Sequence, residues 1–275
     1  MIRTSSHVLL CLFVVACSAS AYSQSFPQDF DKLLLPIILS GPVPGAFGSS
    51  WVTEFSLTNI GDSQLPVIGY DPIPGGCPFT CVPPDPIPAH ATIYPTYRST
   101  RPQVPGNFLW VQKGRLKELA ATLRVQDLSR QLQTWGTSLP VIAESNALTG
   151  RSSLVDVPIA AEFRNLLRVY DFEPNITRSF IVRIYAVQPS QQIPFTNTTA
   201  DQLLVELVGA FATPDFHGST TKAPGYYELG LSALPQLANA HRIRVEIEPI
   251  SGDLQYWAFV SVTNNATQHV TLVTP

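Results

Sequence analysis

The chain has 275 residues, of which only 13% are charged, and its formal net charge is −3. This length is sufficient for one large domain or two ordinary ones. The sequence has no basic stripe that could neutralise phosphates, which argues against a nucleic-acid partner. No run beyond the first 21 residues reaches membrane-spanning length, so we expect no transmembrane segment.

The N-terminus predicts a cleaved signal peptide over residues 1–21. A positively charged start leads into the apolar run 8–16, and small residues at 19–21 suit signal peptidase. We therefore expect the mature protein to be secreted or periplasmic. Residues 14–17 also have the form of a bacterial lipobox, so the alternative is a lipid anchor at Cys17 that holds the protein at the cell envelope.

Short alternating or apolar runs predict β-strands along the rest of the chain. The strictest case is 242–248, in which Ile243, Val245 and Ile247 share one face. The expected strands are 33–39, 51–59, 64–70, 91–97, 108–112, 119–126, 133–142, 153–159, 166–172, 178–187, 242–248, 256–263 and 270–273. This pattern predicts an all-β protein with two antiparallel immunoglobulin-like β-sandwich domains, at 26–148 and 149–275, joined by the polar linker 144–152.

Two segments also fit short helices. Leu116, Leu119, Ala120 and Leu123 match helical spacing, and residues 199–202 resemble a capping box in front of 203–208. Nothing in the chain supports βαβ alternation, which excludes a doubly wound domain.

The segment 71–89 is predicted to be an extended loop of the first domain, because its prolines lack the N–H that a central strand needs. It contains Cys77 and Cys81. In an oxidising compartment we expect these two to form a disulfide that tethers the loop. A redox or metal site is the alternative, but the CxxxC spacing differs from that of thioredoxin-like and zinc-knuckle sites.

No catalytic motif is recognisable, and we therefore expect neither an enzyme nor a cofactor. His217 has the most active-site-like surroundings, yet its loop is rich in Gly, Ser and Thr and needs no function. Asp171, Glu173 and Asn175 carry oxygen-bearing side chains at alternate positions where a strand ends, which suits calcium or ordinary turn chemistry. We expect no metal site there.

Aromatic side chains are the remaining ligand-contact candidates. Trp51 and Trp257 lie in apolar registers and are predicted to be buried in the core. The candidates for exposed, ligand-contacting rings are Trp135, which precedes Gly136, and the pair Tyr226-Tyr227, which follows Pro224-Gly225.

Three stretches carry a resemblance to known sequences: residues 41–51 leading into Thr58-Asn59, residues 124–130 with 134–137, and residues 257–275. Together they resemble a set of uncharacterised secreted bacterial proteins with immunoglobulin-like β-sandwich domains. The resemblance implies the fold and export, and it assigns no functional residue.

These observations favour a secreted, non-catalytic protein with a surface-interaction or structural role and an unidentified protein or glycan partner. One alternative is a carbohydrate-binding or calcium-dependent accessory protein, which exposed aromatic rings would favour. A second alternative is an extracellular hydrolase with a dispersed active site, for which two convergent carboxylates or a Ser-His pair would be needed.

Overall fold

The computed structural model describes residues 29–39, 41–69, 86–95, 103–104, 106–130, 135–173, 178–187, 201–211 and 224–275. Within them the chain is mostly β, and every strand pair is antiparallel. The helical segments are short 3-10 turns: η1 (Ala46–Gly48), η2 (Leu116–Glu118), η3 (Leu128–Arg130), η4 (Glu144–Asn146), η5 (Leu231–Ala233) and η6 (Pro235–Leu237). No helix in the described part of the chain has the length and apolar character needed to cross a bilayer.

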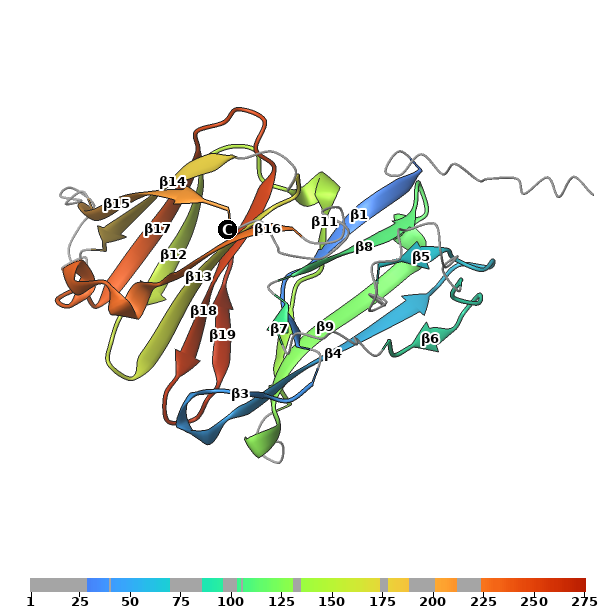
Figure 1. Ribbon diagram of the computed structural model, residues 1–275, viewed down its shortest axis with the longest axis horizontal. Helices are drawn as coiled ribbons and strands as arrows, with labels where there is room; N and C mark the ends of the chain where they lie inside the picture. Colours follow the sequence, from blue (N-terminus) through green and yellow to red (C-terminus); the bar gives the residue numbers. More distant parts are fainter. Residues whose placement is uncertain are drawn as a thin grey trace, which may run out of the picture.

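The N-terminal half of the chain forms two main sheets, drawn on the right of Figure 1. The N1 sheet has the order β11 (Ile142–Ala143), β1 (Phe30–Leu35), β8 (Asn107–Gln112), β5 (Val67–Ile68). The N2 sheet has the order β10 (Thr137–Leu139), β9 (Leu119–Asp127), β4 (Ser50–Asn59), β3 (Val43–Pro44), and β6 (Thr92–Ile93) also pairs with β4. A separate two-stranded ribbon joins β2 (Ile38–Leu39) to β7 (Gln103–Val104).

The C-terminal half forms two further sheets, on the left of Figure 1. The C1 sheet has the order β16 (Gly225–Gly230), β13 (Phe163–Asp171), β18 (Tyr256–Asn264), β19 (Val270–Val273). The C2 sheet has the order β12 (Ser152–Pro158), β17 (Arg242–Pro249), β14 (Ser179–Ala186), β15 (Gln202–Ala210). Each of the four sheets therefore takes its strands from one half of the sequence only.

The all-β prediction is confirmed. The helical alternative at 203–208 is wrong, and the one that begins at Leu116 is limited to the short 3-10 turn η2. Residues 119–127 form β9, which pairs with β4 along nine residues from Asn59 to Trp51. Residues 202–210 form β15, which pairs with β14 and contains one register shift. Hydrogen bonding to a neighbouring strand outweighs the helical spacing of a few leucines, because pairing and burial dominate β formation.

Alternating side chains build one apolar core between the two sheets of each half. In the C-terminal half, Val182 and Ile184 of β14 meet Val245 of β17 and the inward residues of the C1 sheet. In the N-terminal half, Phe55 and Leu57 of β4 pack against the inward residues of the N1 sheet. Period-two alternation is what allows one face of each strand to be buried there.

A third apolar cluster joins the two halves, and we call it the junction cluster. Its buried members are Leu34, Phe108, Trp110 and Ile142 from the N1 sheet side and Tyr170, Phe172, Trp257 and Phe259 from the C1 sheet side. The ring centroids of Phe108 and Phe172 are 5.7 Å apart, which is a normal aromatic contact across the junction. The faces of the N1 and C1 sheets that point away from their own cores therefore pack on each other.

A buried lysine lies at the edge of the junction cluster. Lys32 is only 6% exposed, and its Nζ donates to Glu144 Oε1 at 2.7 Å in the N-terminal half. The same Nζ donates to the carbonyl of Phe172 at 2.8 Å and to Glu173 Oε1 at 3.4 Å in the C-terminal half. A buried ammonium is stable only when its N–H donors have acceptors. The acceptors of Lys32 come from both halves, so Lys32 stabilises the junction only when the two halves are packed together.

Candidate functional site

A cleft of about 480 Å³ lies between the two halves. We call it the inter-half cleft. Its N-terminal wall consists of Ile37, Leu39, Val43, Pro44, Gly45, Trp51, Val125, Thr137 and Leu139, and its C-terminal wall of Arg164, Asn165, Leu166, Arg168, Gly230, Ser232, Ala233, Ser261, Thr263, Val270 and Leu272. Most of these side chains are apolar, as in small-molecule sites, which occur preferentially at interfaces between structural units.

Trp51 forms much of the N-terminal wall and is held by its own loop. Its indole Nε1 donates to Ser49 Oγ at 2.9 Å, and this hydroxyl donates to the carbonyl of Ala46 at 2.8 Å. The prediction that Trp51 belongs to the core is wrong, because its side chain is only partly buried and lines the cleft. The ring shares the register of Phe55 but lies at the start of β4, beyond the end of the sandwich core.

Asp127 fixes the position of this wall from β9. Its Oδ1 accepts hydrogen bonds from the backbone of Ser50 at 2.8 Å and of Ser129 at 3.1 Å, and its Oδ2 accepts from Arg130 at 2.7 Å. Burial on its own raises the pKa of Asp127, but these hydrogen bonds together hold the pKa below its ordinary value. The ionised carboxylate therefore anchors the loop that carries Trp51.

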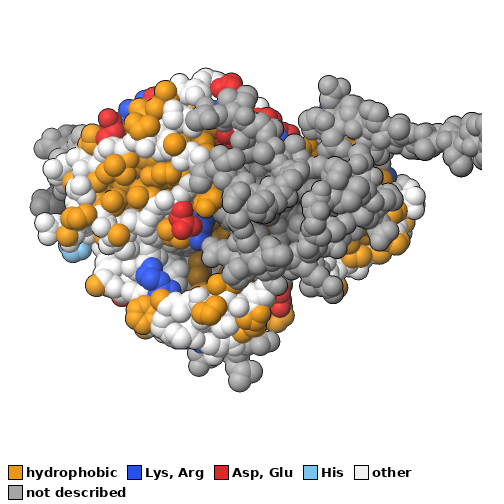
Figure 2. All heavy atoms as spheres, in the orientation of Figure 1, with side chains coloured by type: hydrophobic (Ala, Val, Ile, Leu, Met, Phe, Trp, Pro, Cys, Tyr) orange, Lys and Arg blue, Asp and Glu red, His pale blue; other side chains and the backbone are white. Residues whose placement is uncertain are grey.

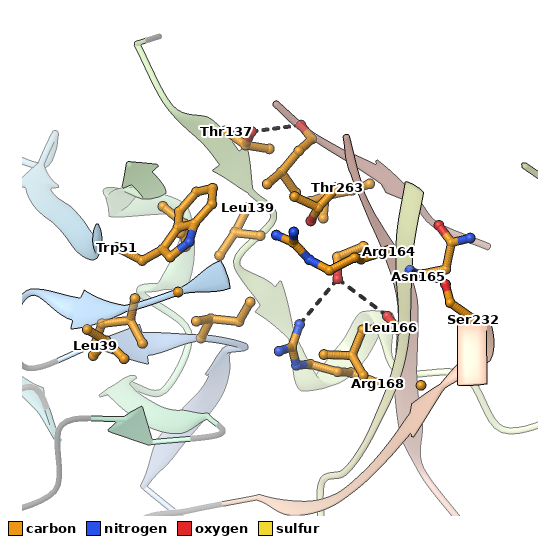
Figure 3. A pocket seen from close by; sticks show the side chains of 18 of the residues that line it. Leu39, Trp51, Thr137, Leu139, Arg164, Asn165, Leu166, Arg168, Ser232 and Thr263 are labelled. Atoms are coloured by element: carbon orange, nitrogen blue, oxygen red, sulfur yellow. Dashed lines mark hydrogen bonds between the residues drawn. The ribbon is translucent and has the colours of Figure 1, made fainter. Parts of the chain in front are cut away.

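The C-terminal wall is built by β13, whose alternation directs Arg164, Leu166 and Arg168 away from the core of its own half. The neighbouring residues Leu167 and Val169 point the other way and are fully buried in that core. Figure 3 shows the guanidinium of Arg164 extending from β13 across the cleft, toward Leu139 and Trp51. Two basic side chains thus face an apolar wall contributed by the other half.

The two arginines differ in how their charge is compensated. Arg168 donates to Glu228 Oε2 at 3.0 Å and so has a carboxylate partner. Arg164 instead donates to two neutral amide oxygens, Asn265 Oδ1 at 2.9 Å and Gln268 Oε1 at 2.8 Å. Arg164 has no carboxylate partner among the described residues, and burial lowers its pKa from the ordinary value.

An aromatic ring from the N-terminal half covers part of Arg164. The guanidinium carbon lies 5.2 Å from the ring centroid of Phe47, within the range of a cation–π interaction. Phe47 itself has a positive φ of 56° and an exposed side chain. On the face in Figure 2, basic and acidic side chains lie among apolar ones around a hollow near the centre.

This arrangement can hold an apolar group and pair with a negative charge. The guanidinium of Arg164 retains unused donors, and a guanidinium remains protonated at any physiological pH. No carboxylate or imidazole is found among the described residues that line the cleft. The lining therefore favours a small amphipathic anion over a cation.

The three ligand-contact candidates from the sequence do not line the inter-half cleft, and they differ in how far their side chains are buried. Trp135 is 81% exposed, beside β10 on the N2 sheet. Tyr226 packs against the junction cluster, and Tyr227 meets the ring of Phe180 edge-on at 5.2 Å, where burial raises the pKa of Tyr227. Trp257 is buried in the junction cluster, as predicted.

The acidic positions at the end of β13 are bound to cationic side chains. Asp171 accepts from Arg178 at 3.4 Å, and Glu173 accepts from Lys32 at 3.4 Å. Burial is the main cause that raises the pKa of Asp171. No group of three His, Cys, Asp or Glu suited to a metal ion occurs in the described part of the chain.

Several sequence expectations fall on other parts of the chain. Residues 1–21 with Cys17, the pair Cys77 and Cys81, Asn175 and His217 lie outside the described residues. The expected disulfide and the expected signal peptide therefore stay predictions.

Sequence reasoning missed Arg164, although a signal for it exists. The expected strand began at residue 166, whereas β13 begins at Phe163. Extending the alternation by two residues places Arg164 on the same outward face as Arg168 and Tyr170. One face of such a strand packs in the core of its own half. When its opposite face combines basic and aromatic side chains, that face is expected to pack against another part of the protein.

Comparison with protein-family models, curated proteins and solved structures gives no significant match. The resemblance to secreted immunoglobulin-like proteins stays a prediction from the sequence.

Proposed function

We propose that this is an exported, non-catalytic binding protein whose inter-half cleft takes a small apolar ligand with a carboxylate or a similar anionic group. The single observation that carries the proposal is the partly buried guanidinium of Arg164, which has no carboxylate partner among the described residues and extends into an apolar cleft. A bound anion would complete the charge-assisted hydrogen bonds that neutral amides satisfy only in part.

The proposed setting is two immunoglobulin-like domains, 26–148 and 149–275, acting outside the cytoplasm. The signal-like residues 1–21 support export, and the distribution of the four sheets between the two halves supports the two-domain layout. In this interpretation the first domain supplies the apolar wall with Trp51, and the second supplies Arg164 and Arg168.

We do not propose hydrolysis at the cleft. A general acid or base needs a carboxylate, an imidazole or a comparable group within reach of the substrate. The described lining offers guanidinium groups, hydroxyls and one amide. Binding is therefore the activity that these side chains support best.

The proposal can be tested with three ligands that share a twelve-carbon tail and differ in charge: dodecanoate, dodecanol and dodecyltrimethylammonium, each below its micellar concentration. Isothermal titration calorimetry should give the tightest binding for dodecanoate and the weakest for the ammonium compound. The variant Arg164→Met keeps much of the side-chain volume and removes the charge. A hydrogen bond to a charged group contributes about 1.5–3 kcal/mol, so this variant should bind dodecanoate about 10- to 150-fold more weakly.

The matched control is Arg242→Met. Arg242 is an exposed arginine that pairs with Asp156 on the C2 sheet and does not line the cleft. This variant should bind dodecanoate as the unmodified protein does. Equal dodecanoate affinity in Arg164→Met and in the unmodified protein, or failure of all three ligands to bind, contradicts the proposal.

A further inference from the structure

A second surface, on the outer face of the N2 sheet, carries two unusually exposed aromatic rings. Trp135 is 81% exposed and Tyr94 is 78% exposed. Both border a depression of about 360 Å³ on the face of the N2 sheet that points away from the core. Large aromatic side chains normally bury their area, and exposed ones at a depression indicate a contact surface.

The ring of Trp135 is supported from one side. The guanidinium of Arg124 lies 4.2 Å from the ring centroid, and Arg124 is itself paired with Glu54 on the adjacent strand. The following residue, Gly136, has a φ of +92°, and a Cβ there would lie 2.7 Å from the carbonyl oxygen of Val125. The backbone therefore lies close against β9, which fixes the indole over Arg124 before any ligand arrives.

The floor between the two rings is polar. Ser56 on β4 lies directly opposite Thr122 on β9, and their hydroxyls are hydrogen-bonded at 2.7 Å. Glu54 lies opposite Arg124 in the same register, and Ser138 of β10 lies opposite Arg124 on its other side. The charges of Glu54 and Arg124 cancel, so the floor presents hydroxyls and a neutral ion pair.

We propose that this face, formed by Trp135, Tyr94 and the polar floor of β4, β9 and β10, binds a neutral carbohydrate. A sugar ring has an apolar C–H face that can stack on an aromatic ring, and its rim of hydroxyls needs both donors and acceptors. The face supplies two open aromatic rings together with serine and threonine hydroxyls, one carboxylate and one guanidinium. The balanced charge of the floor favours an uncharged sugar over an acidic one.

This site is independent of the inter-half cleft. Arg124 and Val125 are consecutive residues of β9, so their side chains point to opposite faces of the N2 sheet. Val125 lines the cleft, whereas Arg124 supports Trp135. A ligand in one site therefore makes no contact with the side chains that hold a ligand in the other.

Affinity electrophoresis through gels that contain a soluble β-glucan, a mannan or a galactan tests the proposal with the full chain. At least one polysaccharide should retard the unmodified protein, and Trp135→Ala and Tyr94→Ala should each weaken the retardation constant roughly ten-fold. Trp135→Phe keeps a smaller ring, so its retardation constant should lie between those of the unmodified protein and Trp135→Ala. Val208→Ala, at a 69% exposed position on β15, should migrate like the unmodified protein.

Both aromatic positions are exposed, so their variants are expected to fold, and circular dichroism of each variant verifies this. The variant Arg164→Met should keep full retardation, because the cleft is a separate site. The proposal is overturned if none of the three polysaccharides retards the protein, or if the two alanine variants migrate like the unmodified protein. It is equally overturned if Trp135→Ala changes only the self-association of the protein in size-exclusion chromatography.

Discussion

Replacement of Phe108 by alanine should separate the unfolding of the two halves. Phe108 is 0% exposed, and its side chain belongs to the junction cluster and to neither sandwich core. Its ring contacts Trp110 at 6.3 Å and Phe172 at 5.7 Å between centroids, and the ammonium of Lys32 lies 5.2 Å from it. The variant therefore removes atoms that bind one half to the other and leaves both cores unchanged.

The expected loss follows from complete burial. A fully buried phenylalanine truncated to alanine costs about 3–5 kcal/mol, of which part is the cavity that remains. For a cooperative unit of 150–250 residues, about 2–4 °C of melting temperature is lost for each kcal/mol, which gives about 6–20 °C here. Because the cavity opens between the halves, their coupling should weaken more than either core.

Differential scanning calorimetry is the suitable assay. We expect one main transition in the unmodified protein and two resolved transitions in Phe108→Ala. The matched control is Phe180→Ala, which truncates an equally buried ring within the core of the C-terminal half. This control should lose comparable stability without improving the separation of the transitions. An unchanged melting temperature in Phe108→Ala, or identical transition shapes in the two variants, would refute this view of the junction.

Three further predictions concern single residues. The pKa of Asp127 is lowered in the folded protein, so its ionised form contributes stability above an unfolded pKa of about 3.9, and this stability is lost as the pH falls through the folded value. Urea unfolding should therefore show Asp127→Asn as destabilised at pH 7 and nearly equal to the unmodified protein at pH 2. Gly136→Ala should cost about 1–3 kcal/mol in the same assay, because alanine is strained at a φ of +92° and its Cβ meets Val125, whereas a neutral result would show that β9 and β10 can move apart. Tyr256→Phe should cost about 1–3 kcal/mol, because its hydroxyl donates to the carbonyl of Gly150 at 2.8 Å, and an unchanged midpoint would contradict this role.

The sequence pattern was sufficient for most strands because each buries one face. The alternation of 242–248 corresponds to β17, and that of 178–187 corresponds to β14. The helix expected at 203–208 was wrong because the leucines and valines of this segment suit either a helix or an edge strand. Only the pairing with β14 decides between the two.

The candidate sites depended on contacts that are distant along the chain. Trp51 and Arg164 line one cleft although 113 positions separate them in the numbering, and no local pattern brings them together. Trp135 was identified from the sequence because it stands beside Gly136, but its support by Arg124 follows from the pairing of β9 with β10. Exposure of a ring can be suspected from its neighbours, whereas a shared cavity requires the tertiary fold.

The contacts between the halves also determine how a ligand could enter the inter-half cleft. The junction cluster ties the halves together, as do the contacts of Lys32 with the carbonyl of Phe172 and with Glu173. A hydrogen bond of 2.8 Å from Thr137 Oγ1 to the carbonyl of Val270 adds a further connection. Any rotation that widened the cleft would expose apolar rings to water, which costs free energy in proportion to the area exposed. We therefore expect the width of the cleft to stay fixed, and ligand binding to leave the radius of gyration of the protein unchanged.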